Sequence, residues 1–255
     1  MTIIGHDVVG EGPIRIILLH DWISDTTSWD MCRPLLDGER FSWAFVDLRG
    51  YGRSRAIPGE HTVTEAAADV MIVADTLGWT KFAVVGHSMS SLIALHLGQI
   101  FPERISRIVV AAPPPPAGLG VDKPTFDYLE SVALGDHAQR IAGFEAMWGD
   151  RLSQQWKIFK EARWRATADP QAAAGFVEMF ARQGLPDRQR PVSVRVLALT
   201  GECDAEIMRA QAVRESLAPL CPDLLVEKIA EAGHYPMQEA PPLTYTLIER
   251  FLASG

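Results

Sequence analysis

The chain has 255 residues, of which 47% are hydrophobic and 22% are charged, a composition typical of a soluble globular domain with a sizeable core. Its formal net charge of −8, with no block of lysine and arginine, argues against nucleic acid or an anionic membrane as the main partner. The three cysteines are too few and too scattered for a disulfide framework or a zinc cluster, which favours free thiols in a reduced compartment. We see no signal-peptide pattern, and no apolar run approaches the ~20 residues of a membrane helix. We therefore expect a cytoplasmic protein.

Runs rich in isoleucine, valine and leucine predict strands at about 14–19, 42–47, 82–86, 105–111, 194–200 and 224–229. The runs are nearly continuous rather than alternating, which is typical of strands that are covered on both faces. They alternate with helical stretches, so the pattern predicts an α/β fold with a mostly parallel central sheet flanked by helices.

The stretch from about 123 to 182 departs from this alternation. It follows Pro113–Pro116, a stiff extended breaker, and it is helical in pattern, rich in aromatic residues and without a convincing strand. We therefore expect a catalytic core of residues 1–116 and 190–255, and an inserted helical cap of residues 117–189. From the aromatic side chains of this cap we select Phe126, Trp148 and Trp164 as candidate substrate contacts.

The segment 81–95 is an apolar, β-branched run followed directly by an apolar helical run, with Gly86-His87-Ser88-Met89-Ser90 between them. A strand that turns straight into a helix at Gly-x-Ser-x-small exposes the serine hydroxyl at the top of a sheet. Small residues are needed because the strand and helix backbones pass close together there. Ser90 stands where glycine is usual. We expect Ser88 to be a nucleophile rather than a simple helix N-cap, with the N–H of Met89 placed to bind an oxyanion.

A serine hydroxyl needs a base to become nucleophilic at neutral pH, and the base needs an orienting carboxylate. The C-terminal third supplies both, each just after a strand-like run: Asp204 ends the turn 201–204, and His234 ends the turn 232–234. The chain order Ser88, Asp204, His234 is one of the known orders of a Ser-His-Asp triad. We expect these three side chains to meet at one edge of the sheet.

Four segments together resemble the α/β-hydrolase superfamily, over nearly the whole length of the chain. They are the strand and turn at 16–22, the Asp-x-x-Gly-x-Gly-x-Ser loop at 46–54, the elbow at Ser88, and the two turns that hold Asp204 and His234. The resemblance implies the α/β-hydrolase fold, a helical cap over the carboxyl edge of the sheet, and an acid in the Gly-x-x-Asp turn.

Some members of the superfamily read His-Gly-Trp at the turn after this strand. By resemblance to them, we expect the second oxyanion donor to be the backbone N–H of Trp22. This sequence has Asp21 in place of that glycine. A carboxylate beside an oxyanion site would oppose the negative charge that catalysis must stabilise. We therefore expect either that Asp21 points outward, or that the site is not optimised for ordinary ester hydrolysis.

These residues predict a serine hydrolase that uses no cofactor and no metal, of the carboxylesterase or lactonase type, acting on a small to medium apolar substrate through an acyl-enzyme on Ser88. Two alternatives keep the fold: a hydrolase of carbon–carbon bonds, and a cofactor-free dioxygenase of heteroaromatic rings. A remoter one is a non-enzymatic receptor for a small ligand. A dehalogenase or epoxide hydrolase is disfavoured, because those enzymes resemble this chain but carry aspartate at the elbow.

Overall fold

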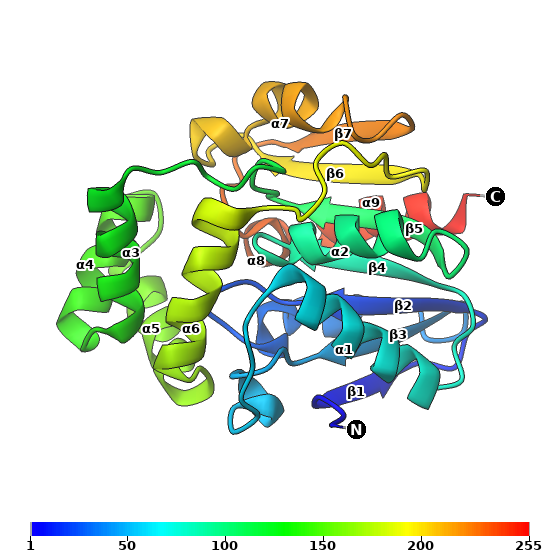
Figure 1. The fold of residues 1–255 in the computed structure, drawn as a ribbon, viewed down its shortest axis with the longest axis horizontal. Helices are drawn as coiled ribbons and strands as arrows, with labels where there is room; N and C mark the ends of the chain where they lie inside the picture. Colours follow the sequence, from blue (N-terminus) through cyan, green and yellow to red (C-terminus); the bar gives the residue numbers. More distant parts are fainter. Residues whose placement is uncertain (1, 255) are drawn as a thin grey trace.

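The computed structural model describes residues 2–254 and is built around a seven-stranded sheet (Figure 1). The strand order is β1-β3-β2-β4-β5-β6-β7, and every neighbouring pair is parallel except β1 with β3. The strands are β1 (His6–Val9), β2 (Ile14–Leu19), β3 (Phe41–Val46), β4 (Phe82–His87), β5 (Ile105–Ala111), β6 (Val196–Gly201) and β7 (Leu224–Ile229).

Burial across the sheet explains the sequence pattern of its strands. Every residue of β3, β4 and β6 is buried, as expected for strands with helices on both faces. The edge strands β1 and β7 are partly exposed. All six predicted strands are present within two residues of their predicted bounds; the short antiparallel β1 was not predicted, because four residues without an apolar run carry little signal.

Helices cover both faces of the sheet. Helices α1 (Val63–Thr76) and α2 (Ser90–Ile100) lie against one face, and α8 (Pro236–Glu239) and α9 (Pro241–Ala253) lie behind the sheet in Figure 1. Helix α7 (Ala210–Leu217) packs beside β6 and β7. The predicted fold class, a mostly parallel sheet flanked by helices with a helical insertion, is confirmed.

The insertion lies between β5 and β6, at the sheet edge where the parallel strands end (left in Figure 1). It consists of α3 (Lys123–Leu134), α4 (His137–Trp148), α5 (Gln154–Thr167), α6 (Pro170–Glu178) and the π-helix η4 (Met179–Gln183). Each α-helix begins after a side chain that accepts a hydrogen bond from its first turn, the caps being Asp122, Asp136, Ser153 and Asp169. These caps satisfy N–H groups that have no partner within the helix, so the local sequence fixes where each helix begins.

Short 3-10 helices occupy several of the remaining connections: η1 (Thr26–Trp29), η2 (Arg33–Leu35), η3 (Gly52–Ser54) and η5 (Glu206–Met208). No helix within residues 2–254 has both the length and the apolar character needed to cross a membrane.

Candidate active site

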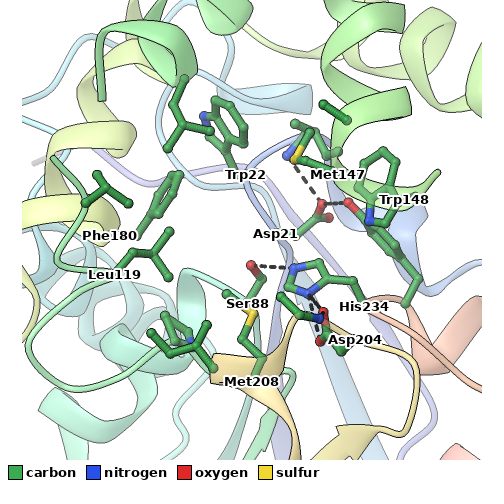
Figure 2. A pocket seen from close by; sticks show the side chains of 18 of the residues that line it. Asp21, Trp22, Ser88, Leu119, Met147, Trp148, Phe180, Asp204, Met208 and His234 are labelled. Atoms are coloured by element: carbon green, nitrogen blue, oxygen red, sulfur yellow. Dashed lines mark hydrogen bonds and ion pairs between the residues drawn. The ribbon is translucent and has the colours of Figure 1, made fainter. Parts of the chain in front are cut away.

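Three strand ends bring the predicted triad together at the carboxyl edge of the sheet. Ser88 directly follows β4, Asp204 follows β6 and His234 follows β7. Because these strands are parallel, their carboxyl ends share one edge, and loops far apart in the sequence converge there. The Ser88 hydroxyl lies 2.9 Å from Nε2 of His234, and the opposite ring nitrogen, Nδ1, lies 3.0 Å from Oδ2 of Asp204 (Figure 2).

The turn at Ser88 has the strained backbone that its sequence predicts. Ser88 has a φ of +52°, in the left-handed region that a residue with a side chain rarely adopts. Its N–H donates to the carbonyl of Ala111 at 2.8 Å, which anchors the turn to β5. Ser90, the departure from glycine, is buried and donates its hydroxyl to the carbonyl of His20. The Ser90 hydroxyl therefore joins the elbow to the turn after β2.

Gly86 shows why the elbow needs a small residue on its strand side. A Cβ at Gly86 would overlap the carbonyl group of Ser90 and approach the nitrogen of Ser91 to 2.9 Å. We expect Gly86→Ala to lower the free energy of unfolding by about 1–3 kcal/mol, the usual effect of overpacking a core. Urea denaturation would measure this. Gly38→Ala is the matched control, because its added carbon would meet only Gly10, at 3.1 Å, and a comparable loss in that variant would contradict the explanation.

The hydrogen bonds assign a protonation state to each member of the triad. Nδ1–H of His234 donates to the Asp204 carboxylate, which leaves Nε2 as the acceptor for the Ser88 hydroxyl. Burial disfavours the charged form of Asp204, but the neighbouring His234 and the N–H of Ala205 outweigh it and lower the pKa of Asp204. Burial likewise disfavours the His234 imidazolium, but Asp204 reverses this effect and the pKa of His234 is raised. The arrangement can accept a proton from Ser88.

The turn after β2 is held by the side chain of His20, within the turn, and by that of Tyr51, in the loop after β3. His20 bonds the carbonyl of Asp21 through Nδ1 at 2.7 Å and accepts the Leu48 N–H at Nε2, at 3.0 Å. Tyr51 donates its hydroxyl to the carbonyl of Trp22 at 2.7 Å. The turn is therefore rigid in the place where an oxyanion donor was predicted.

The two predicted oxyanion donors are the N–H groups of Trp22 and Met89. Within residues 2–254, neither group donates a hydrogen bond to a backbone or side-chain acceptor. A backbone N–H that is left free beside a nucleophile is what an oxyanion site requires. Met89 also immediately precedes α2, whose positive end favours negative charge.

Asp21 lies at the cavity wall, yet its carboxylate is not directed toward solvent. Its Oδ1 accepts a hydrogen bond from the Ser28 hydroxyl, and its Oδ2 accepts one from the Tyr235 hydroxyl, each at 2.6 Å. The Ile23 N–H also approaches Oδ2, at 3.3 Å. Of the two alternatives given by the sequence, the outward orientation of Asp21 is excluded, because three donors in the protein interior hold the carboxylate there.

A cavity of about 370 Å³ opens in front of Ser88 and His234. Its walls come from both the core and the insertion and are mainly apolar (Figure 2). Among the apolar residues are Trp22, Leu119, Met147, Trp148, Phe180 and Met208. The volume lies within the range typical of small-molecule sites, so the cavity can hold a small to medium apolar group beside the serine.

Of the three cap aromatics that were predicted to contact substrate, Trp148 lines the cavity, whereas Phe126 and Trp164 do not. Phe126 is covered by the Arg182 guanidinium, 3.4 Å from its ring centroid. Trp164 packs edge-on against Trp22, with ring centroids 5.2 Å apart. Those two assignments are corrected: Phe126 packs inside the insertion, and Trp164 supports Trp22 from behind.

Sequence reasoning missed the apolar residues that line the cavity beside Trp148. Leu119 and Phe180 belong to segments joined by a hydrogen bond from the Leu119 N–H to the Phe180 carbonyl, and Met147 lies at the end of α4. Their apolar character is visible in the sequence, but it is the same for cavity and core residues. Only the packing of the insertion on the sheet separates the two groups.

The alpha/beta hydrolase family model matches residues 16–245, which is most of the chain. The chain belongs to the alpha/beta hydrolase family.

Individual relatives of this alpha/beta hydrolase are distant. A pimeloyl-[acyl-carrier protein] methyl ester esterase from Serratia marcescens is 23% identical over 263 residues, covering 100% of both chains. Among solved structures, an esterase from Exiguobacterium antarcticum has a TM-score of 0.86 at 20% identity and covers 98% of this chain and 96% of the other. The enol-lactonase of Burkholderia xenovorans has a TM-score of 0.82 at 20% identity, covering 98% and 96%. These structural likenesses show the shared fold.

The Asp-x-x-Gly-x-Gly-x-Ser loop of this alpha/beta hydrolase is held in place by hydrogen bonds of Asp47 and Ser54. Asp47 accepts hydrogen bonds from the N–H of Thr26 at 3.0 Å and from Arg53 Nε at 2.6 Å, and Ser54 donates to the Asp47 carbonyl. Gly52 packs against the Asp47 side chain with a φ of +49°, where a Cβ would not fit. The loop joins β3 to the segment around η1 and contributes no residue to the cavity wall.

Proposed function

We propose that this hydrolase is a serine carboxylesterase or lactonase that works through an acyl-enzyme on Ser88. The observation that carries the proposal is the hydrogen-bonded series Ser88–His234–Asp204, with successive separations of 2.9 and 3.0 Å, at the base of an apolar cavity. A serine, an imidazole and a carboxylate in this geometry form the general arrangement for acyl transfer.

In the first half of the reaction, Nε2 of His234 takes the proton from Ser88 as the serine oxygen bonds to the substrate carbonyl carbon. The carbonyl oxygen becomes an oxyanion, which the N–H groups of Met89 and Trp22 bind. When this intermediate collapses, the bond to the leaving oxygen breaks and His234 returns the proton to that oxygen. In a lactone the leaving alcohol stays attached to the acyl group.

In the second half, a water molecule gives a proton to Nε2 of His234 and its oxygen attacks the acyl carbon. The Ser88 oxygen leaves with that proton, and the carboxylic acid is released. His234 must be neutral to start either half. Because its pKa is raised, we expect the rate to fall on the acidic side from a higher pH than for an ordinary imidazole.

The charges around the cavity favour an uncharged acyl group. The titratable residues in the cavity wall are Asp21, Asp204, His234 and Tyr235, and none of the described lining residues is lysine or arginine. A substrate carboxylate would lose its hydration there without gaining a cationic partner, which is strongly unfavourable. The acyl group of the substrate is therefore proposed to be apolar and neutral.

A pair of esters of similar acyl length tests this substrate class. We expect 4-nitrophenyl butyrate to be hydrolysed with a kcat/KM at least about tenfold higher than 4-nitrophenyl hemisuccinate, because only the second carries a carboxylate into the cavity. The release of nitrophenol measures both rates, and the methyl ester of the hemisuccinate is the control for chain length. Equal rates for the butyrate and the hemisuccinate would contradict the assignment.

A further inference from the structure

Asp21 is a buried carboxylate at the position where the resemblance places glycine. Asp21 is 1% exposed, and each of its carboxylate oxygens accepts a hydrogen bond from a hydroxyl group, one from Ser28 and the other from Tyr235. Figure 2 places Asp21 on the far side of the His234 ring from Asp204. A second carboxylate is thus built into the surroundings of the proposed base.

Tyr235 connects this carboxylate to the base through the main chain. It is the residue directly after His234, and it is buried, with its hydroxyl 2.6 Å from Oδ2 of Asp21. Its ring also packs edge-on against the His234 ring, with centroids 5.5 Å apart. Fixing the Tyr235 side chain at both ends restricts the position of the imidazole that precedes it.

His87 gives a second connection between the same two residues. Its Nε2–H donates to the carbonyl of His234 at 2.7 Å, so Nδ1 carries the lone pair when the ring is neutral. Nδ1 is buried without a hydrogen-bond partner in residues 2–254 and lies 3.8 Å from Oδ1 of Asp21. Burial lowers the pKa of His87, so the neutral form is favoured. The Asp21 charge therefore remains to be balanced by another group.

Lys160 of α5 is that group. It is 1% exposed, and its ammonium lies 4.1 Å from the centroid of the Tyr235 ring. Within the described chain, Nζ has no hydrogen-bond partner. Burial disfavours the ammonium and lowers the pKa of Lys160, while the Asp21 and Asp25 carboxylates act in the opposite direction and the Tyr235 ring face adds attraction. Burial acts to raise the pKa of Asp21, but Lys160 and the neighbouring donors outweigh it and hold that pKa well below its usual range.

We propose that Asp21, Tyr235 and Lys160 form a charge-balanced unit through which helix α5 of the insertion positions the base His234 and sets its proton affinity. Asp21 and Lys160 are positioning residues, since neither transfers a proton in the reaction. Removing the Asp21 charge takes an attractive charge from the imidazolium, whereas removing the Lys160 charge leaves Asp21 without its compensation, so the two removals act in opposite directions. The inference rests on the proposed function, in which His234 is the base.

The charged and titratable groups that face His234 come from every element around it. Besides Asp21 and Asp204, the carboxylate of Glu239 in α8 accepts the N–H groups of Gly233 and Tyr235, and it pairs with Arg151. The Asp21 and Asp25 carboxylates attract the charge of Lys160, and Arg163 repels it. The remaining titratable neighbours of the imidazole are His87 and Tyr235. Asp204 and Glu239 stay unchanged in the variants below, so the shifts report Asp21 and Lys160.

The pH dependence of kcat/KM for 4-nitrophenyl butyrate tests the unit. In Asp21→Asn the imidazolium loses an attractive charge, so the midpoint of the acidic limb moves to lower pH. In Lys160→Met the Asp21 charge is no longer offset, so the midpoint moves to higher pH. At the effective dielectric of partly buried sites, each shift is expected to be about one pH unit. The double variant Asp21→Asn/Lys160→Met returns the midpoint toward that of the unmodified enzyme.

Lys157→Met is the matched control, because it removes the same charge from the same helix three residues away, and we expect its midpoint to be unchanged. Shifts of the two single variants in the same direction, an equal shift in Lys157→Met, or no shift in folded protein would each overturn the proposal. If Asp21→Asn fails to fold, Lys160→Met and its control Lys157→Met decide, since neither of them carries the Asp21 change.

A substrate-free readout separates this inference from the proposed function. Nitrogen NMR follows the ionisation of the His234 ring in each variant, with His234→Gln identifying its signal among the seven histidines. Opposite shifts of the His234 titration support the charge-balanced unit even if the esters are not hydrolysed. An unmoved His234 titration in active enzyme overturns the unit while leaving the serine mechanism in place.

Discussion

Replacing Ser88 with alanine is expected to lower kcat by about a thousandfold or more. The variant lacks the oxygen that attacks the carbonyl, while the cavity and the free N–H groups of the turn are left in place. The φ of +52° at position 88 is set by the turn and not by the hydroxyl, so the fold is expected to survive. Steady-state hydrolysis of 4-nitrophenyl butyrate, with circular dichroism to verify folding, measures the effect.

Ser91→Ala is the matched control for this change. Ser91 is buried in the first turn of α2, and its hydroxyl donates to the carbonyl of Gly86 at 3.1 Å rather than to His234. We expect this variant to keep turnover within about tenfold of the unmodified enzyme, because it loses one ordinary hydrogen bond and no reacting group. Near-normal turnover in Ser88→Ala would refute the acyl-enzyme.

Covalent labelling gives a second measurement on the same three proteins. A fluorophosphonate should label the unmodified enzyme and Ser91→Ala, but not Ser88→Ala, because only an activated hydroxyl reacts. An unmodified enzyme that stays unlabelled would favour a ligand-binding role over hydrolysis.

Replacing Asp204 with asparagine is expected to lower kcat by on the order of 10³–10⁴-fold, while changing the volume of the side chain very little. The carboxylate accepts the Nδ1–H of His234 and thereby keeps Nε2 free to receive a proton. An asparagine amide can donate to Nδ1 instead, which stabilises the tautomer with its proton on Nε2. That tautomer is unable to take the Ser88 proton. Steady-state kinetics at a pH well above the acidic limb would show the loss without interference from protonation.

Glu202→Gln tests whether the acid has been assigned to the correct carboxylate of this turn. Glu202 is exposed and accepts a hydrogen bond from the N–H of Glu231 at 3.1 Å, as well as pairing with Lys228. It makes no contact with His234, so we expect its removal to leave kcat nearly unchanged. Loss of activity in Glu202→Gln with retention in Asp204→Asn would reverse the assignment.

The arrangement of the triad could be predicted from the sequence because it depends on strand ends. Ser88, Asp204 and His234 each follow a strand that the sequence predicts, and parallel strands necessarily place those ends at one edge. The sharp turn at Ser88 is likewise indicated by Gly86, where no side chain would fit. Backbone topology and local steric limits determine these features, and both leave a direct pattern in the order of the amino acids.

Contacts between the insertion and the core could not be predicted in the same way. Trp148 and Trp164 look alike in the sequence, yet one lines the cavity and the other packs behind Trp22. The sequence also left the orientation of Asp21 open, because the Tyr235 hydroxyl and the Ser28 hydroxyl that hold it come from other loops. Each of these features depends on how helices and loops dock on a sheet, for which a single sequence carries no direct signal.

The insertion between β5 and β6 contributes none of the three residues of the proposed triad. In the proposed reaction, the bond-breaking residues all lie in the core, whereas part of the cavity wall lies in the insertion. Mutations that reshape α3, α4 or η4 are therefore expected to alter which compounds are accepted while leaving the triad in place. Lys160 is an exception among the residues of the insertion, because it contacts Tyr235, the residue directly after His234. By the inference above, substitution of Lys160 would change the pH range in which the enzyme is active. Laboratory evolution of new specificities should therefore keep this lysine.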